Sequence, residues 1–200
     1  MTLHIGTAAW ALPREVRDRF PAGPSNLARY AGCFDATEIN SSFHRPHRRA
    51  TYARWAASVP AHCRFAVKLP KAITHHARFI DCEEPLARFA EEVSGLGEKR
   101  GPLLVQLPPK FAFDAALAAR FFAQLDETIG GRVALEPRHP SWFTPEAEAL
   151  LAAHRIARVA ADPAPVAKAA SPGGWRGFSY FRLHGSPRIY WSAYDNASHS

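Results

Sequence analysis

Leu103-Leu104-Val105-Gln106-Leu107-Pro108-Pro109 is a short apolar run that ends at two prolines. A run of this length next to turn-forming residues is typical of a buried β-strand. Comparable runs lie at residues 3–6, 36–40, 64–69, 133–137, 156–162 and 178–185. Together with the first run they predict seven strands, distributed over almost the whole chain.

Helical patterns separate these strands. Residues 24–30, 48–57 and 85–96 carry apolar side chains at helical spacing, and Asp114 and Thr144 are suitable N-caps for two later helices. Strands that alternate with helices form right-handed βαβ units with a parallel sheet. The first strand is not followed by a G-x-G-x-x-G turn, which argues against a dinucleotide-binding fold. The sequence thus predicts an α/β protein, a TIM-type (β/α) barrel in a single domain over residues 1–200.

The composition is that of an ordinary globular chain. Of the 200 residues, 47% are hydrophobic, and no apolar run is long enough to cross a membrane. The N-terminal residues do not resemble a secretory signal, so we expect a cytoplasmic protein with no membrane partner. Cys33, Cys63 and Cys82 are far apart and show no C-x-x-C spacing, which predicts free thiols.

The net charge of +7 favours anionic partners. The densest basic patch is His44-Arg45-Pro46-His47-Arg48-Arg49. Two interpretations stay open: a solvated patch that steers an anionic substrate, or part of a nucleic-acid groove.

Polar and charged side chains recur where the predicted strands end. Because the active site of a β/α barrel lies at the carboxyl ends of its strands, these residues are the candidates for the site. They are Glu38, Asn40, Lys68, Gln106, Glu136, Arg138, His139, Asp162, Arg182 and His184. A buried charge without a partner costs several kcal/mol, so we expect these groups to neutralise one another or a ligand. A purely structural ion-pair network is the alternative.

The residue types indicate roles. We assign catalysis to Glu136 and Asp162 as acid and base, with Lys68 and His139. Substrate binding is assigned to Glu38, Asn40, Gln106, Arg138, Trp142, Arg182 and His184. Glu136 and Asp162, joined by His139 and His184, are alternatively ligands for a divalent metal. No compact motif such as H-E-x-x-H is present, so no metal site is assigned, and both a metal and a cofactor are left open.

At these residues the chain resembles the domain of unknown function 72 family, also called YecE-like. The matching segments are Gly6-Thr7-Ala8-Ala9-Trp10, Glu38-Ile39-Asn40-Ser41-Ser42-Phe43, Phe65-Ala66-Val67-Lys68-Leu69-Pro70, Gly101-Pro102-Leu103-Leu104-Val105-Gln106-Leu107-Pro108-Pro109, Glu136-Pro137-Arg138-His139-Pro140-Ser141-Trp142 and Arg182-Leu183-His184-Gly185. The resemblance implies a TIM-type barrel and brings no settled activity. Ala9 and His44 depart from the residues common in that family.

The family resemblance also implies a further β/α unit after residues 189–194. The polar residues 195–200 contain no strand pattern, so we expect about seven strands, with the last β/α unit lacking. A barrel with open edges on its first and last strands is prone to pairing, and we therefore expect self-association.

Three functional hypotheses follow. The first is an acid–base enzyme of hydrolase or lyase type that acts on an anionic or phosphorylated small molecule. The second is a nucleic-acid-binding or processing protein, and the third is a ligand-binding barrel without catalysis. Fold alone does not choose among them.

Overall fold

The computed structural model describes residues 2–185. The chain divides into two compact units, each described by itself: unit 1 holds residues 2–104 and 124–131, and unit 2 holds residues 105–123 and 132–185. The predicted single domain over residues 1–200 stays a prediction. The expectations for residues 189–194 and 195–200 lie outside the described residues.

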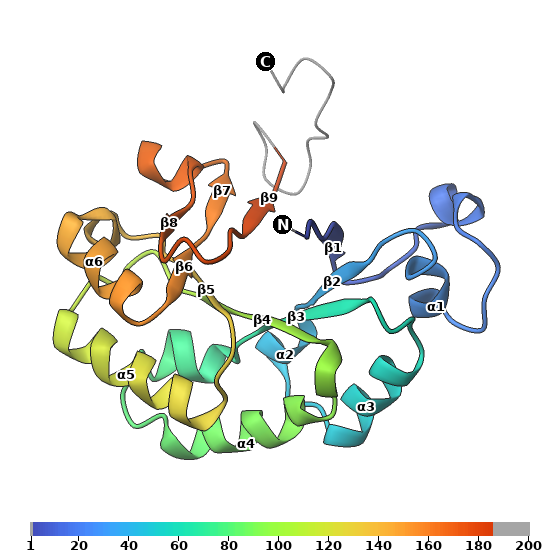
Figure 1. Ribbon diagram of the computed structural model, residues 1–200, viewed down its shortest axis with the longest axis horizontal. Helices are drawn as coiled ribbons and strands as arrows, with labels where there is room; N and C mark the ends of the chain where they lie inside the picture. The colour runs from blue at the N-terminus through green and yellow to red at the C-terminus, as the bar shows by residue number, and fades with distance from the viewer. Residues whose placement is uncertain (1, 186–200) are drawn as a thin grey trace. The chain divides into compact units, whose positions relative to one another are not determined.

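Strands and helices alternate along the chain, as the sequence predicts (Figure 1). The strands are β1 (Gly6–Ala8), β2 (Ala36–Ile39), β3 (Arg64–Lys68), β4 (Arg100–Gln106), β5 (Val133–Glu136), β6 (Ile156–Arg158), β7 (Ala160–Asp162), β8 (Gly173–Gly174) and β9 (Phe181–Leu183). The α-helices are α1 (Asn26–Tyr30), α2 (Ser41–His44), α3 (Arg49–Ala57), α4 (Glu83–Ser94), α5 (Ala115–Thr128) and α6 (Pro145–Ala153). Shorter helical segments are the 3₁₀ helices η1 (Arg14–Arg19), η3 (Gly97–Lys99), η4 (Pro140–Phe143) and η5 (Ala167–Ala170) and the π-helix η2 (Ala72–His76).

Unit 1 is built on parallel strands in the order β1-β2-β3-β4. Its core is formed by apolar strand residues such as Ile39, Phe65 and Val67, all of them buried. Helices α3 and α4 pack against each other, and a Cβ at Gly95 would lie 2.2 Å from the Arg49 carbonyl oxygen. Glycine is therefore required where the two helices meet.

The last two residues of β4, Val105 and Gln106, belong to unit 2. The strand order there is β4-β5-β6-β8, in which the short β8 is antiparallel to β6. A second pair, β7 with β9, is parallel. Asp114 and Thr144 cap α5 and α6 as predicted: Asp114 Oδ1 accepts from Leu117 N–H, and Thr144 Oγ1 accepts from Ala147 N–H. Helix α6 packs on β6 and β8.

The fold class predicted from the sequence is confirmed: this is an α/β fold with a mostly parallel sheet, in the strand sequence of a TIM-type barrel. Taken together, β6 and β7 form the sixth strand position and β9 the seventh. Within residues 2–185, β1 and β8 stand at the two ends of the longer strand order. Self-association through such edges stays a prediction.

Two predicted strands differ from the observed ones. The first strand lies at Gly6–Ala8 rather than at residues 3–6, and the Leu3 and Ile5 side chains are exposed. The predicted strand at 156–162 is interrupted at Val159, whose N–H donates to the Leu135 carbonyl while Ala160 N–H donates to Tyr180. The interruption arises because the two halves pair with different strands. Among residues 2–185, no helix is long and apolar enough to cross a membrane.

Candidate functional site

One buried carboxylate organises the candidate site of unit 2. Glu136 is the last residue of β5 and is 4% exposed. The side-chain amide of Gln106, at the end of β4, donates to Glu136 Oε1 at 3.0 Å. The guanidinium of Arg182, from β9, donates to Glu136 Oε2. The ends of β4 and β5 and the middle of β9 thus contribute to one polar cluster. The ends of parallel strands are where barrels place their sites.

A second guanidinium and an imidazole complete this cluster. Arg138 Nη2 lies 3.6 Å from Glu136 Oε1, and its side chain is 35% exposed. His184 Nε2 lies 3.7 Å from the same oxygen and 3.4 Å from Arg182 Nη1. We call Gln106, Glu136, Arg138, Arg182 and His184 the Glu136 cluster. The two arginines carry one more positive charge than the single carboxylate offsets.

The surroundings fix the charge of Glu136. Burial alone would raise the pKa of this carboxyl, but the facing His184 and the charges of Arg182 and Arg138 outweigh burial and lower the pKa to about 2. Glu136 is therefore ionised at neutral pH. In this state it accepts hydrogen bonds and orients its neighbours, and it has no proton to donate as a general acid.

Asp162 contacts the Glu136 cluster through its backbone. It is the last residue of β7, and its carbonyl accepts from the N–H of His184, a member of the cluster, at 2.8 Å. The predicted acid–base pairing of Asp162 with Glu136 stays a prediction.

His139 and Trp142 have structural positions. Nδ1 of His139 accepts from the Ser141 N–H at 3.3 Å, so this ring nitrogen caps η4. Trp142 is fully buried, packs edge-on against Phe113 at 5.0 Å, and donates from Nε1 to the Phe111 carbonyl. The predicted roles of His139 in catalysis and of Trp142 in substrate contact stay predictions.

The remaining predicted residues, Glu38, Asn40 and Lys68, belong to unit 1. Lys68 ends β3, is buried, and places Nζ 4.0 Å from the centroid of the Phe43 ring. Glu38 is buried on β2, and Oδ1 of Asn40 is a buried acceptor without a hydrogen-bond partner among the described residues. Their convergence with the Glu136 cluster stays a prediction.

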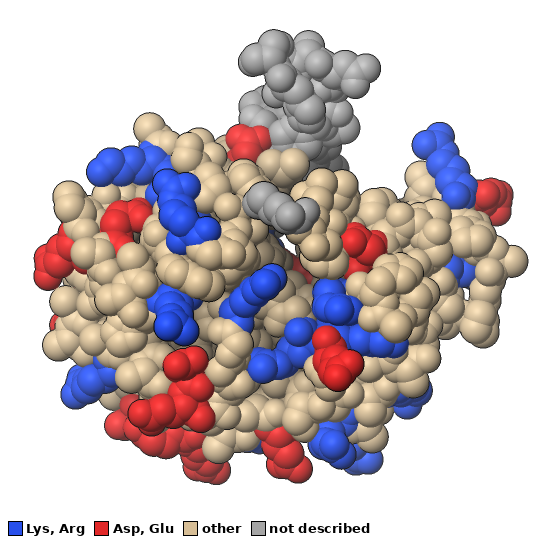
Figure 2. All heavy atoms as spheres, in the orientation of Figure 1, with Lys and Arg blue, Asp and Glu red and all other residues tan. Residues whose placement is uncertain are grey.

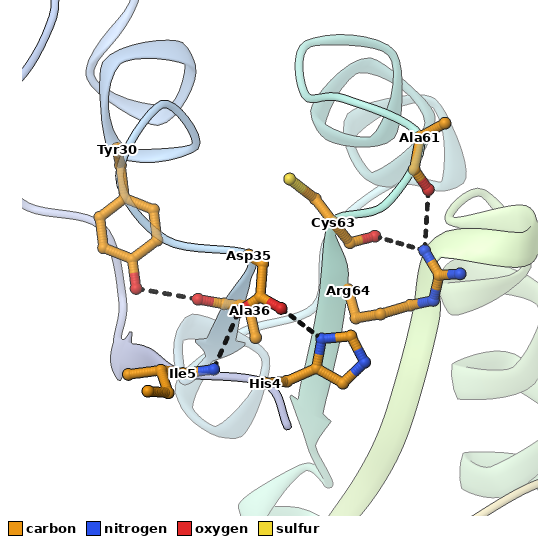
Figure 3. A network of polar contacts seen from close by, with 8 residues as sticks. All are labelled: His4, Ile5, Tyr30, Asp35, Ala36, Ala61, Cys63 and Arg64. Carbon is orange, nitrogen blue, oxygen red and sulfur yellow. Dashed lines mark hydrogen bonds and ion pairs between the residues drawn. The ribbon is translucent and has the colours of Figure 1, made fainter. Parts of the chain in front are cut away.

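A different polar network lies at the opposite, amino ends of the unit 1 strands (Figure 3). Asp35 accepts from the Ile5 N–H at 2.9 Å and contacts His4 Nδ1 at 2.7 Å. Burial alone would raise the pKa of Asp35, but these two hydrogen bonds outweigh burial and lower the pKa. Arg64 donates to the carbonyls of Ala61 and Cys63. In a β/α barrel this face serves stability, so we interpret the network as structural.

Sequence reasoning missed one buried ion pair of unit 2. Arg158, on β6, donates from Nε to Glu148 of α6, and the other Glu148 oxygen accepts from the Gly174 N–H. An arginine in the middle of an apolar run was the only signal for it. Within residues 2–185, no group of three or more His, Cys, Asp or Glu side chains is placed to hold a metal ion.

The comparisons with known proteins agree with this architecture. The family model described as "Protein of unknown function DUF72" matches residues 4–200. The UPF0759 protein YecE of Escherichia coli is 29% identical over 142 residues, which are 70% of this chain and 50% of that protein. The matched stretch therefore spans about half the length of this relative.

Two solved structures share the fold. A DUF72 family protein of Enterococcus faecalis superposes with a TM-score of 0.75 at 20% identity, over 96% of this chain and 74% of that one. A DUF72 family protein of Thermotoga maritima gives a TM-score of 0.70 at 22% identity, over 98% and 79% of the two chains. From the family match over nearly its whole length, we conclude that this chain belongs to the DUF72 family.

Proposed function

We propose that the Glu136 cluster is the binding site for a small anionic molecule and that the chain acts on this molecule by acid–base chemistry. The observation that carries the proposal is the surplus of positive charge: Arg182 and Arg138 face one buried carboxylate. A carboxylate or phosphate on a ligand would balance the second guanidinium. Ligands of β/α barrels bind at this edge of the strands, which supports the location.

Arg138 is the side chain best suited to contact the ligand. Its 3.6 Å separation from Glu136 exceeds a hydrogen bond, and one third of the side chain is exposed. Arg182 is buried and donates to Glu136 at hydrogen-bond distance. We therefore assign Arg138 to the ligand and Arg182 to holding Glu136 in place. A guanidinium binds carboxylates and phosphates through two parallel hydrogen bonds, which supports either ligand class.

His184 is our candidate for proton transfer, because an imidazole has one nitrogen that can accept a proton and one that can donate it. Glu136 stays ionised and has no proton to give. Nε2 of His184 lies 3.7 Å from Oε1 of Glu136. A hydrolase or lyase reaction needs such a group next to the bound anion. Glu136 is then a positioning residue for His184 and the arginines.

The test is calorimetric titration with citrate and with inorganic phosphate. We expect binding by the wild type and a loss of about tenfold or more in affinity for Arg138→Gln, with stability changed by less than about 0.5 kcal/mol. Arg120→Gln, an exposed change on α5 of the same unit, is the matched control and should bind like the wild type. Equal binding by the wild type and Arg138→Gln, or binding by neither, would contradict the assignment.

Catalysis is tested separately, by screening ester, phosphoester and hydroxy-acid substrates with the wild type and His184→Gln. Turnover that depends on His184 supports an enzyme. Retention of an anion without turnover favours the ligand-binding barrel instead.

A cytoplasmic location also stays a prediction, and fractionation of cells that produce the protein checks it.

A further inference from the structure

The basic patch at residues 44–49 borders a hollow in unit 1 that the proposed function does not use. The hollow has a volume of about 450 Å³, and Arg48, Arg49, Arg88, Glu91 and Glu92 line it with His47. This volume lies within the range of roughly 300 to 1,000 Å³ that is usual for small-molecule sites. All the lining residues come from the segment before α3, from the start of α3 and from α4.

Two of the three arginines are anchored through Nε. Arg49 Nε donates to Ser94 Oγ at 2.9 Å, and Arg88 Nε donates to Glu92 Oε1 at 3.2 Å. Anchoring at Nε restricts the orientation of a guanidinium and does not use its two terminal nitrogens. Such a group is prepared to bind an oxyanion in a bidentate manner.

The charges around the hollow favour an incoming anion. Arg48 is the N-cap of α3 and Arg49 is its first residue, and at this end of a helix the dipole is positive and acidic side chains are the favourable ones. Burial and the nearby charge of Arg45 lower the pKa of His47, so its ring adds no positive charge at neutral pH. Two like charges at the positive helix end are unfavourable on their own, and a bound anion would relieve this repulsion.

The acidic residues limit the size and charge of that anion. Glu92 is already engaged by Arg88 and by the His47 N–H at 3.4 Å, while Glu91 is exposed on the wall. Figure 2 shows basic side chains gathered over the region of α2 and α3, with acidic side chains beside them. A ligand with several consecutive phosphates would be repelled by the carboxylates of Glu91 and Glu92. A ligand with a single phosphate would avoid this repulsion, and its hydroxyl groups could donate hydrogen bonds to Glu91.

We propose that this hollow binds a small phosphate monoester that also carries hydroxyl groups. The phosphate lies between the guanidinium groups of Arg48, Arg49 and Arg88, and the hydroxyl groups face Glu91. This site is separate from the Glu136 cluster and does not depend on it.

The test is calorimetric titration of the full chain with glucose 6-phosphate, with unphosphorylated glucose as the ligand control. We expect glucose 6-phosphate to bind and glucose not to bind. The double variant Arg48→Gln/Arg49→Gln should lose about tenfold or more in affinity. Arg54→Gln, exposed on the same helix α3, should bind like the wild type. Arg138→Gln is titrated in parallel, to separate binding in the hollow from binding at the Glu136 cluster.

Three results would overturn the proposal. One is the absence of binding by the wild type, and another is unchanged affinity in the double variant. The third is retention of a single-stranded oligonucleotide, with a steep salt dependence, while glucose 6-phosphate is not bound. If affinity is lost only in Arg138→Gln, the ligand belongs to the Glu136 cluster, and the hollow is not its site.

Discussion

Unit 2 contains two carboxylates paired with buried arginines, and they differ in charge balance. Glu148 meets one guanidinium, that of Arg158, and its second oxygen accepts the Gly174 N–H. Glu136 meets Arg182 and also has Arg138 within ion-pair distance. The Glu148 pair ties α6 to β6 and β8, and both carboxylate oxygens of Glu148 accept a hydrogen bond within the fold. In the Glu136 cluster, two guanidinium groups face one carboxylate.

This difference separates a structural ion pair from a candidate binding site. The arginine of each pair is buried, so burial of the arginine does not distinguish them. The Arg158 guanidinium of the Glu148 pair also lies 4.9 Å from the Phe143 ring. The Glu136 cluster opens to solvent through Arg138. Charge balance and access together, rather than the presence of an ion pair, indicate where a ligand binds.

The largest expected effect comes from Glu136→Gln. The substitution keeps the shape of the side chain but leaves Arg182 buried without its counter-charge, so we expect a loss of about 3 kcal/mol in the free energy of unfolding. Affinity for citrate should rise at the same time, because the competing negative charge is gone. Urea unfolding and calorimetric titration measure the two quantities. A variant as stable as the wild type would contradict the assigned pairing.

The pH dependence of the free energy of unfolding also tests the role of the Glu136 carboxylate. Its pKa is about 2 in the folded chain, against 4.5 for an unperturbed glutamate, so ionised Glu136 stabilises the fold fully above pH 4.5. This contribution is lost as the pH falls from about 4.5 towards 2. The stability difference between the wild type and Glu136→Gln should therefore shrink over this range. A constant difference in urea unfolding between pH 7 and pH 3 would count against the lowered pKa.

Glu148→Gln should destabilise the fold by less, about 2 kcal/mol, because the Glu148 side chain is 28% exposed and water can reach part of the site. Anion affinity at the Glu136 cluster should not change. The pair of variants tests the comparison directly: both lower the melting temperature, and only Glu136→Gln alters the titration with citrate. An effect of Glu148→Gln on binding would remove the distinction.

Thr144→Ala is the smallest change of this series. It removes the side chain that accepts the Ala147 N–H at the start of α6, the helix that carries Glu148. Loss of an N-cap costs about 1 kcal/mol. Thr144→Ser keeps the hydroxyl and should recover most of this loss in thermal unfolding. Equal melting temperatures for all three proteins would show that this cap does not contribute.

The fold and part of the site follow from local sequence patterns. Strand runs, cap residues and the alternation of elements are local properties, which is why Asp114 and Thr144 were predicted correctly as caps. The expectation that polar residues gather at strand ends selected Gln106, Glu136 and Arg182, and the structure places these three side chains in contact. These residues share a cluster because parallel strands end on the same edge.

The remaining features depend on contacts between distant segments. Arg158 lies inside an apolar run, and only the position of Glu148 on α6 explains its burial. Gly173–Gly174 pairs with β6 although two glycines carry no strand pattern. Trp142 follows a strand end, yet Phe111 and Phe113 enclose it in the core. None of these partners can be identified from sequence spacing.

The Tyr30 hydroxyl has a consequence for how unit 1 opens. This group of α1 donates to the Ala36 carbonyl of β2 (Figure 3). It also accepts from the Thr7 N–H of β1, so a phenol bridges the two strands. The retention of β1 in the sheet is thereby coupled to the folding of α1. In native-state hydrogen exchange we expect amide protons of α1 and β1 to become exchangeable with one common opening free energy, as a single cooperative unit below the global unfolding.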